Sequence, residues 1–318
     1  MSKRFYILLL PALLFLAALM LSFSHTPMNE VQLGQKLFFD PILSADRSIR
    51  CASCHKPELA FADSVSFSIG VEGRLATRNT PSVMNMAMRD VYFWDGRAAS
   101  LEEQVRGPIE NPNEMNLPFR EAVLRLQASA EYRALFQQVY HHKPDSASLL
   151  HSIAAYERTL ETDQTPSDRW LNDLPGGLTA SEIRGRELFL SPKTHCFDCH
   201  YTPDFTADEF KNIGLFNGKD LNDSGRYLIT HLPEDIGKFK VPGLRNVSVT
   251  APYMHNGMFK TLKEVIDYYD NPDRFVLHSI NRDTALLKPI GLTPQEKLDL
   301  EAYLIALTDD RFVPSRKK

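Results

Sequence analysis

The chain has 318 residues, of which 43% are apolar and 24% are charged, a composition that excludes a disordered protein. Its length allows two domains of ordinary size. The formal net charge of -4 comes with no long run of lysine and arginine. A nucleic-acid-binding role therefore has no electrostatic support.

The N-terminal segment is typical of an export signal. Lys3 and Arg4 precede an apolar stretch over residues 5–23. We predict that residues 1–24 form a signal peptide and that the rest of the chain reaches the periplasm. The alternative is an uncleaved membrane anchor, against which Pro11 argues, because proline disfavours a permanent helix.

All four cysteines fall in two C-x-x-C-H motifs, CASCH at Cys51–His55 and CFDCH at Cys196–His200. In this motif each thiol can form a thioether to a haem vinyl group, and the histidine becomes the proximal iron ligand. A thioredoxin-like dithiol needs only one pair, and a four-cysteine zinc site leaves both histidines unexplained. We therefore predict two covalently bound haem c groups, attached through Cys51, Cys54, His55, Cys196, Cys199 and His200.

Helical periodicity and turn residues predict how the chain is divided. Apolar residues recur at helical spacing over Phe119–Tyr140 and Ser148–Leu160. Proline and glycine cluster in residues 165–177, which indicates a boundary. We predict an N-terminal haem domain of residues 25–172 and a C-terminal one of residues 173–318. Capping boxes predict further helix starts at Thr179, Thr261 and Thr293.

The surroundings of the two motifs repeat. The matching segments are Gly34–Pro41 with Gly185–Pro192, Arg78–Asn79 with Arg245–Asn246, Tyr92–Gly96 with Tyr253–Gly257, and Ser100–Glu103 with Thr261–Glu264. We therefore predict a mainly α fold of two cytochrome c-like haem domains, related by internal duplication and carrying long loops.

The repeat also bears on the second axial ligand of each iron. In a helix capped by Thr261, one face carries Tyr269 together with Leu262, Val265 and Ile266. Tyr269 would then face the haem, and its phenol oxygen can bind ferric iron. The equivalent residue of the first half is Pro108, which has no donor, so the first haem is predicted to be open. A core role for Tyr269 is the alternative, with Met258 or Met254 as rival ligand.

Three residues near the first motif are candidates for catalysis. A carboxyl group such as Glu114 could move a proton between the two oxygens of a peroxide, with Gln104 beside it. Trp94 could relay electrons between the haems. From the residues alone, a solvated surface position for Glu114 and core packing for Trp94 are the simpler interpretations.

Together these motifs resemble those of bacterial di-haem cytochrome c peroxidases and the related MauG enzymes. The resemblance spans about Gly34 to Thr308 and is also carried by the segments Leu37–Pro41, Arg78–Pro81, Phe93–Arg97 and Ala251–Gly257. It implies that the haem on His55 is peroxidatic and that the haem on His200 accepts electrons, with Trp94 between them. Gln104 and Glu114 match the distal pair of the family.

The resemblance implies a calcium ion as well, at positions that match Asn79, Thr250 and Pro252. Two departures separate this chain from many peroxidases of the family. Val71 stands where a blocking histidine is common, and Tyr269 stands where methionine is common. MauG-like enzymes carry tyrosine at the latter position.

Three functions follow as expectations. The first is a peroxidase that reduces hydrogen peroxide to water with electrons from a small periplasmic protein, a cytochrome c or a cupredoxin. The second is a MauG-like enzyme that oxidises residues of a partner protein. The third is a di-haem electron carrier, for which Met84, Met86 or Met88 would have to close the first haem. Family members are often dimers, so a homodimer is a further expectation, and membrane contact is expected only if the N-terminal segment remains.

Overall fold

The computed structural model describes residues 28–313, and helices dominate them. The longer helices are α2 (Glu30–Phe39), α4 (Leu101–Glu110), α5 (Phe119–Ala128), α6 (Ala130–Tyr140), α7 (Ser146–Glu157), α9 (Ala180–Leu190), α11 (Leu262–Asp270) and α12 (Pro294–Ile305). The shorter ones are α3 (Cys51–Cys54), α8 (Pro166–Leu171) and α10 (Tyr227–Thr230). A small antiparallel sheet pairs β1 (Phe210–Lys211) with β2 (Phe239–Lys240). The prediction of a mainly α protein is confirmed, whereas the predicted signal peptide lies outside the described residues.

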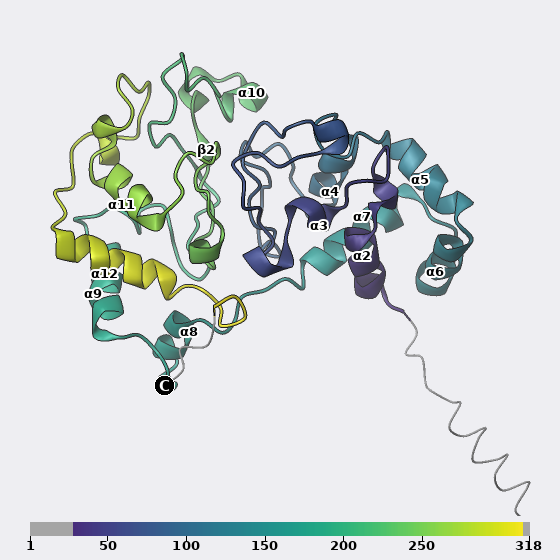
Figure 1. Ribbon diagram of the computed structural model, residues 1–318, viewed down its shortest axis with the longest axis horizontal. Coiled ribbons are helices and arrows are strands. Elements are labelled where there is room, and N and C mark those ends of the chain that lie inside the picture. The colour runs from purple at the N-terminus through teal and green to yellow at the C-terminus, as the bar shows by residue number, and fades with distance from the viewer. Residues whose placement is uncertain (1–27, 314–318) are drawn as a thin grey trace, which may run out of the picture.

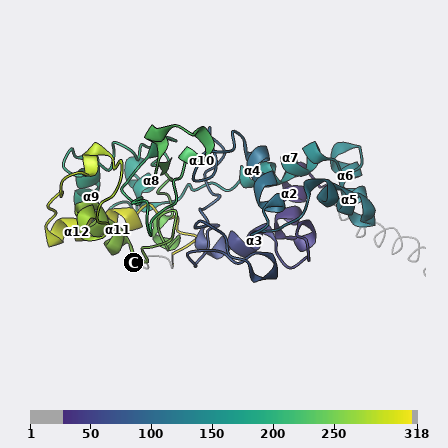
Figure 2. The ribbon, with the colours of Figure 1, turned by 90° about the horizontal axis from the view of Figure 1, so that it is seen from above.

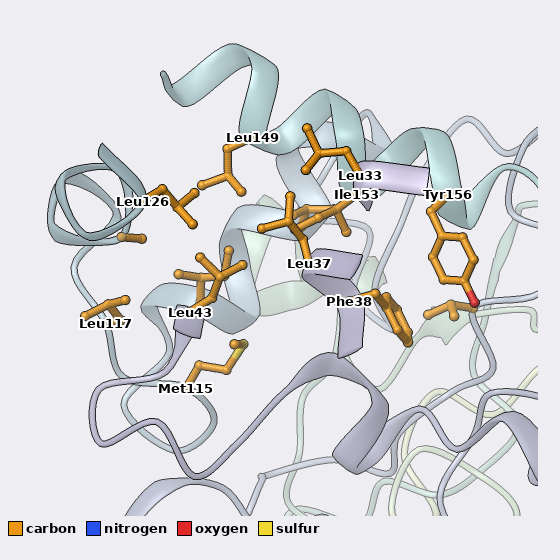
Figure 3. Close-up of a cluster of buried hydrophobic side chains, with 14 of the residues drawn as sticks. Leu33, Leu37, Phe38, Leu43, Met115, Leu117, Leu126, Leu149, Ile153 and Tyr156 are labelled. Carbon is orange, nitrogen blue, oxygen red and sulfur yellow. The ribbon is translucent and has the colours of Figure 1, made fainter. Parts of the chain in front are cut away.

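The N-terminal half is built on the crossing of α2 and α7. At this crossing the two backbones touch, because a Cβ atom at Gly34 would lie only 1.8 Å from the Ser152 carbonyl oxygen. Only glycine permits so close an approach. Figure 3 shows the core around the crossing, which includes the fully buried side chains of Leu33, Leu37, Phe38, Leu149 and Ile153.

The C-terminal half is built on a similar crossing of α9 and α12. A Cβ atom at Gly185 would lie 1.9 Å from the Asp299 carbonyl oxygen and 2.8 Å from the Cβ atom of Tyr303. In the N-terminal half, the corresponding distance from Gly34 to the Cβ atom of Tyr156 is 3.0 Å. The two halves lie side by side, as the two views in Figures 1 and 2 show.

The helical pattern over Phe119–Tyr140 is interrupted at Ser129, so two helices stand where the periodicity alone suggests one run. Ser129 is extended, with φ −75° and ψ 122°, and its side chain accepts a hydrogen bond from the Tyr132 amide. Such a cap satisfies an amide that has no partner within α6 and stabilises the break. The predicted helix starts are confirmed, since capping boxes are formed by Thr179, Thr261 and Thr293.

The segment in which a domain boundary is predicted holds α8, and α8 lies beside α9 and α12 (Figure 1). The Ser167 amide donates to the Ala306 carbonyl at 3.2 Å. The Arg245 side chain forms an ion pair with Asp168 at 2.9 Å. The chain therefore packs against the C-terminal half from α8 onward. Within residues 28–313, no helix is both long and apolar enough to cross a bilayer.

Ion pairs join the two halves. Arg78 binds Asp223 at 2.7 Å and also Asp95 of its own half at 2.6 Å. Arg89 binds Asp204 at 2.7 Å and Asp208 at 3.0 Å. Both arginine side chains are largely buried. Removing one partner of a buried pair leaves an uncompensated charge, so these contacts hold the halves in one arrangement.

We expect Gly185→Ala to destabilise the protein, because the new Cβ atom can fit only if the Asp299 backbone moves. Overpacking of this kind costs roughly 1–3 kcal/mol, and more when backbone must shift. Urea unfolding followed by circular dichroism measures the change. Glu187→Ala, at an exposed position of the same helix, is the control and should stay within about 0.5 kcal/mol of the unaltered protein. Equal stability of both variants would show that the crossing has room for a side chain.

Candidate active site

A cavity of about 940 Å³ is lined by residues from both halves, and both C-x-x-C-H motifs reach its wall. We call the part around His55 the first pocket and the part around His200 the second pocket. The wall is mostly apolar, with a few polar side chains that face inward. A cavity of this kind suits a large, flat, apolar group held at a small number of polar points.

Each motif presents its histidine in the same way. The Nδ1 atom of His55 donates to the Phe61 carbonyl at 3.0 Å, and that of His200 donates to the Phe205 carbonyl at 2.7 Å. Burial lowers the pKa of both imidazoles, which favours the neutral form. A hydrogen bond at Nδ1 fixes the tautomer and leaves Nε2 free to bind a metal.

The four thiols are not joined as disulfides. Burial raises the pKa of Cys54 and of Cys196 to about 11, so both are neutral thiols in the protein alone. Thiols that stay unpaired beside a free imidazole, at the edge of a large apolar cavity, fit covalent haem attachment. The residues present therefore fit two haem c groups, one in each pocket.

The structure brings Glu114, Gln104 and Pro108 together in the wall of the cavity. Burial raises the pKa of Glu114, and the Asn111 amide donates to its carboxyl at 2.6 Å. The Gln104 carbonyl oxygen is buried without a hydrogen-bond partner in the described part of the chain. Buried polar atoms are normally paired, so an orphan oxygen facing a cavity indicates a group that binds there.

Val71 is 1% exposed and lies beside the loop that carries Glu114. Its amide donates to the Glu114 carbonyl at 2.8 Å. A valine side chain cannot bind iron. The position at which the family resemblance places a blocking histidine thus supports the distal loop through its backbone.

Trp94 lies where the halves meet. Its Nε1 atom donates to the Asn79 carbonyl at 2.8 Å, and its own carbonyl accepts from the Lys240 amide at 2.7 Å. The indole packs edge-on against His255 with 6.5 Å between ring centroids, and His255 stacks on Phe239 at 3.6 Å. Trp94 is therefore fixed to both halves of the protein.

The two neighbouring tyrosines of α11 point in different directions. Tyr269 lines the cavity with Leu262, Val265 and Ile266, as the helical periodicity predicts. Burial raises the pKa of Tyr269, so the neutral phenol is favoured. Tyr268 is fully buried, and its hydroxyl donates to the Ile213 carbonyl at 2.6 Å.

The rival methionine ligands have different surroundings. The Met258 sulfur accepts from the Asn256 amide at 3.7 Å, and Met258 packs, as Tyr269 does, against a buried cluster but is not itself among the residues that line the cavity. Met254 does line the cavity. In the first half, Met88 is 82% exposed, whereas the Met84 sulfur accepts from Asn246 at 3.5 Å. Met84 and Met86 both line the cavity, so an electron carrier would depend on one of these two methionines.

The residues that match the calcium positions, Asn79, Thr250 and Pro252, all line the same cavity. The Asn79 amide donates to the carbonyls of Val65 and Ser66 at 3.2 and 3.4 Å. Amide and carbonyl oxygens suit a hard cation. Within residues 28–313, no group of three or more histidine, cysteine, aspartate or glutamate side chains is arranged to hold a metal. The calcium ion therefore stays a prediction.

Comparison with known proteins places this geometry in a family. The profile of the family described as di-haem cytochrome c peroxidase matches residues 28–174. The methylamine utilization protein MauG of Methylorubrum extorquens is 36% identical over 284 residues, which cover 88% of this chain and 78% of that protein. The chain belongs to the di-haem cytochrome c peroxidase and MauG family.

Other relatives agree with this assignment. The cytochrome-c peroxidase IdrP1 of Pseudomonas sp. strain SCT is 34% identical over 311 residues, with 88% of this chain and 81% of IdrP1 covered. The crystal structure of a MauG-like protein associated with microbial copper homeostasis matches with a TM-score of 0.80 at 32% identity. That match covers 91% of this chain and 93% of the other. The protein is thus an oxidoreductase of the peroxidase class, and its family implies two haem c cofactors.

Sequence reasoning did not identify Asn111 or the carbonyls of Phe61 and Phe205. The spacing of Asn111 and Glu114, three residues apart, was the available signal. The sequence carries no signal for the two carbonyls, because every residue has a backbone carbonyl. Their selection depends on a positive φ of 57° at both Phe61 and Phe205.

We expect Asn111→Ala to move the pH profile of the peroxide reaction. The hydrogen bond from Asn111 lowers the pKa of Glu114, so its loss raises that pKa further. If the reaction needs the carboxylate form of Glu114, the acid limb of its pH–rate profile should move to higher pH in this variant. Stopped-flow rates across pH measure the shift. Asn113→Ala, which also alters the cavity wall, is the control, and an unmoved acid limb in Asn111→Ala would contradict the role of this hydrogen bond.

Proposed function

We propose that this protein is a di-haem cytochrome c peroxidase that reduces hydrogen peroxide to water with electrons from a small redox protein. The observation that carries the proposal is the first pocket. There Glu114 and Gln104 line the cavity, Pro108 offers no ligand, and Val71 is buried and bonded through its amide to the loop of Glu114. Peroxide entering the first pocket would therefore meet Glu114 and Gln104, and neither Val71 nor Pro108 would supply a ligand that blocks the haem iron.

When bound, the haem groups supply the iron chemistry that cleaves the O–O bond and stores electrons. The chain supplies proton transfer. Glu114 takes a proton from one peroxide oxygen and delivers it to the other, so that water leaves. Burial keeps its proton affinity high, and the Asn111 amide holds the carboxyl in place. The Gln104 oxygen can accept a hydrogen bond from the bound peroxide.

Electrons would enter at the second pocket and cross at Trp94, which is bonded to both halves. Two electrons and two protons complete the reduction of one peroxide to two waters.

We further propose that the halves arose by duplication. The matching crossings at Gly34 and Gly185 and the matching histidine contacts support this. A periplasmic location, a calcium ion at Asn79, Thr250 and Pro252, and a small cytochrome c or cupredoxin as donor belong to the same proposal.

A MauG-like oxidation of residues in a partner protein is the second candidate. Val71 and the position of Tyr269 favour it, because an anionic oxygen ligand on the second haem stabilises high oxidation states. Reduced cytochrome c, added after peroxide, distinguishes the two functions. A peroxidase oxidises it catalytically, whereas a MauG-like enzyme does so poorly.

Hydrogen peroxide added to the fully oxidised protein should change the haem absorption spectrum rapidly. We expect Glu114→Gln to slow this reaction by roughly 10²–10⁴-fold, because the proton shuttle is lost. Glu110→Gln, which alters an exposed ion pair with Arg106, is the control and should react at the original rate. A reaction that begins only after one-electron reduction would mean that a ligand blocks the first haem. No reaction in either state would exclude both enzyme functions and leave electron transfer as the function of the protein.

Tyr269→Phe should change the electron paramagnetic resonance spectrum of the second haem, because in this proposal the phenol oxygen would bind its iron. Tyr268→Phe is a matched control. It removes only the hydrogen bond to Ile213, which costs about 1 kcal/mol of stability, and should leave the spectrum unchanged. An unchanged spectrum in Tyr269→Phe, with a change in Met258→Leu or Met254→Leu, would transfer the ligand role to methionine.

A further inference from the structure

Glu157 is a buried carboxyl group that the proposed reaction does not use. It is the last residue of α7, is 4% exposed, and lines the cavity. Its Oε2 atom has no hydrogen-bond partner among the described residues. A carboxylate in such a place is poorly stabilised, so the neutral acid is favoured.

The charged neighbours of Glu157 do not compensate for its burial. Arg158, the next residue, is held by Glu102 of α4 at 2.9 Å. Glu102 itself opposes a second negative charge at Glu157. Burial is the largest effect and raises the pKa of Glu157 to about 8. The other titratable groups that sense this carboxyl are Tyr156 of α7 and the thiol of Cys51 of α3.

The second pocket shows that the fold does not need a carboxyl here. Gly34 touches Ser152 and Tyr156 at its helix crossing, and Gly185 touches Asp299 and Tyr303. The residue after Tyr303 is Leu304, which also lines the cavity. An apolar side chain thus takes this place in the second half, and a titratable one takes it in the first.

Glu157 is placed to sense charge in the first pocket. The pKa of Cys51, which anchors the first haem, is raised in part by the charge of Glu157. A positive charge gained by the haem favours the carboxylate, and an added electron favours the protonated acid. By linkage, the proton and the electron change each other's binding by the same free energy.

We propose that Glu157 stores a proton for the first haem, taking one from solvent when that haem gains an electron and returning it when the electron leaves. The inference rests on haem attachment at Cys51 and Cys54 under the proposed function. One electron is taken from the reductant and up to one proton from water, so charge stays nearly balanced in a pocket of low polarity. Glu114, by contrast, handles the protons of peroxide itself.

Spectroelectrochemical titration between about pH 6 and 9 tests the proposal. In the unaltered protein the reduction potential of the first haem should fall as pH rises. The equilibrium constant for reduction of this haem should decrease by up to about tenfold for each pH unit. Glu157→Gln and Glu157→Leu should remove most of this dependence and leave the second haem unchanged. Glu161→Gln, at an exposed carboxyl nearby in the chain, is the control and should behave like the unaltered protein.

Redox-difference infrared spectra give a second readout. A band of a protonated carboxyl should appear on reduction and be absent from Glu157→Gln. A first-haem potential that does not depend on pH, or a dependence retained in Glu157→Gln, would overturn the proposal. Peroxide reactivity of the unaltered oxidised protein separates the two levels of inference, because it tests the open first pocket whether or not Glu157 stores a proton.

Discussion

The contact on which the rest of the structure depends is the backbone-to-backbone helix crossing in each half. At Gly34 and Gly185 no side chain separates the helices, so the backbones are in direct contact and the crossing has no room for adjustment. The helix before each haem motif is thereby held against the helix that closes its half. Cys51 packs on the core of one crossing and Cys196 on that of the other. The histidines that follow are thus directed into the cavity by rigid elements, not by loops alone.

A cavity of about 940 Å³ between such rigid elements has a consequence for its polar atoms. Interiors pack densely, and buried polar groups are normally bonded, so an apolar wall with orphan oxygens makes sense only around a bound group. The orphan oxygens of Gln104 and Glu157 both line this cavity. In the second half, Leu304 lines the cavity in the place of Glu157, and the Tyr269 phenol lines it as a possible oxygen ligand. The two pockets therefore differ chemically in a few side chains, although the helix crossings that hold them are similar.

Local signals in the sequence were sufficient for the haem motifs, the capping boxes at Thr179, Thr261 and Thr293, and the separation of Tyr269 from Tyr268. Each depends on spacing within one helix or motif. The break at Ser129 was not predicted, because the apolar periodicity continues across it. The ion pairs of Arg78 with Asp223 and of Arg89 with Asp204 could not be predicted, since their partners are far apart in the chain and no spacing rule connects them. The same holds for the bond from Trp94 to Asn79, which depends on a turn in the intervening loop.

The junction between the halves bears on the choice between peroxidase and protein-oxidising activity. Trp94 is bonded to Asn79 and to the Lys240 amide, and buried ion pairs of Arg78 and Arg89 also join the halves, so the two pockets keep a fixed separation. In the proposed function, electron exchange between the pockets would then need no rearrangement, which would serve both activities equally. The proposed proton chemistry of the first pocket would also be common to both. In the proposed function, what separates them is the group that would bind the second haem iron and the protein that would dock outside it. Tyr269 would then carry the internal part of that distinction, and the partner would carry the rest.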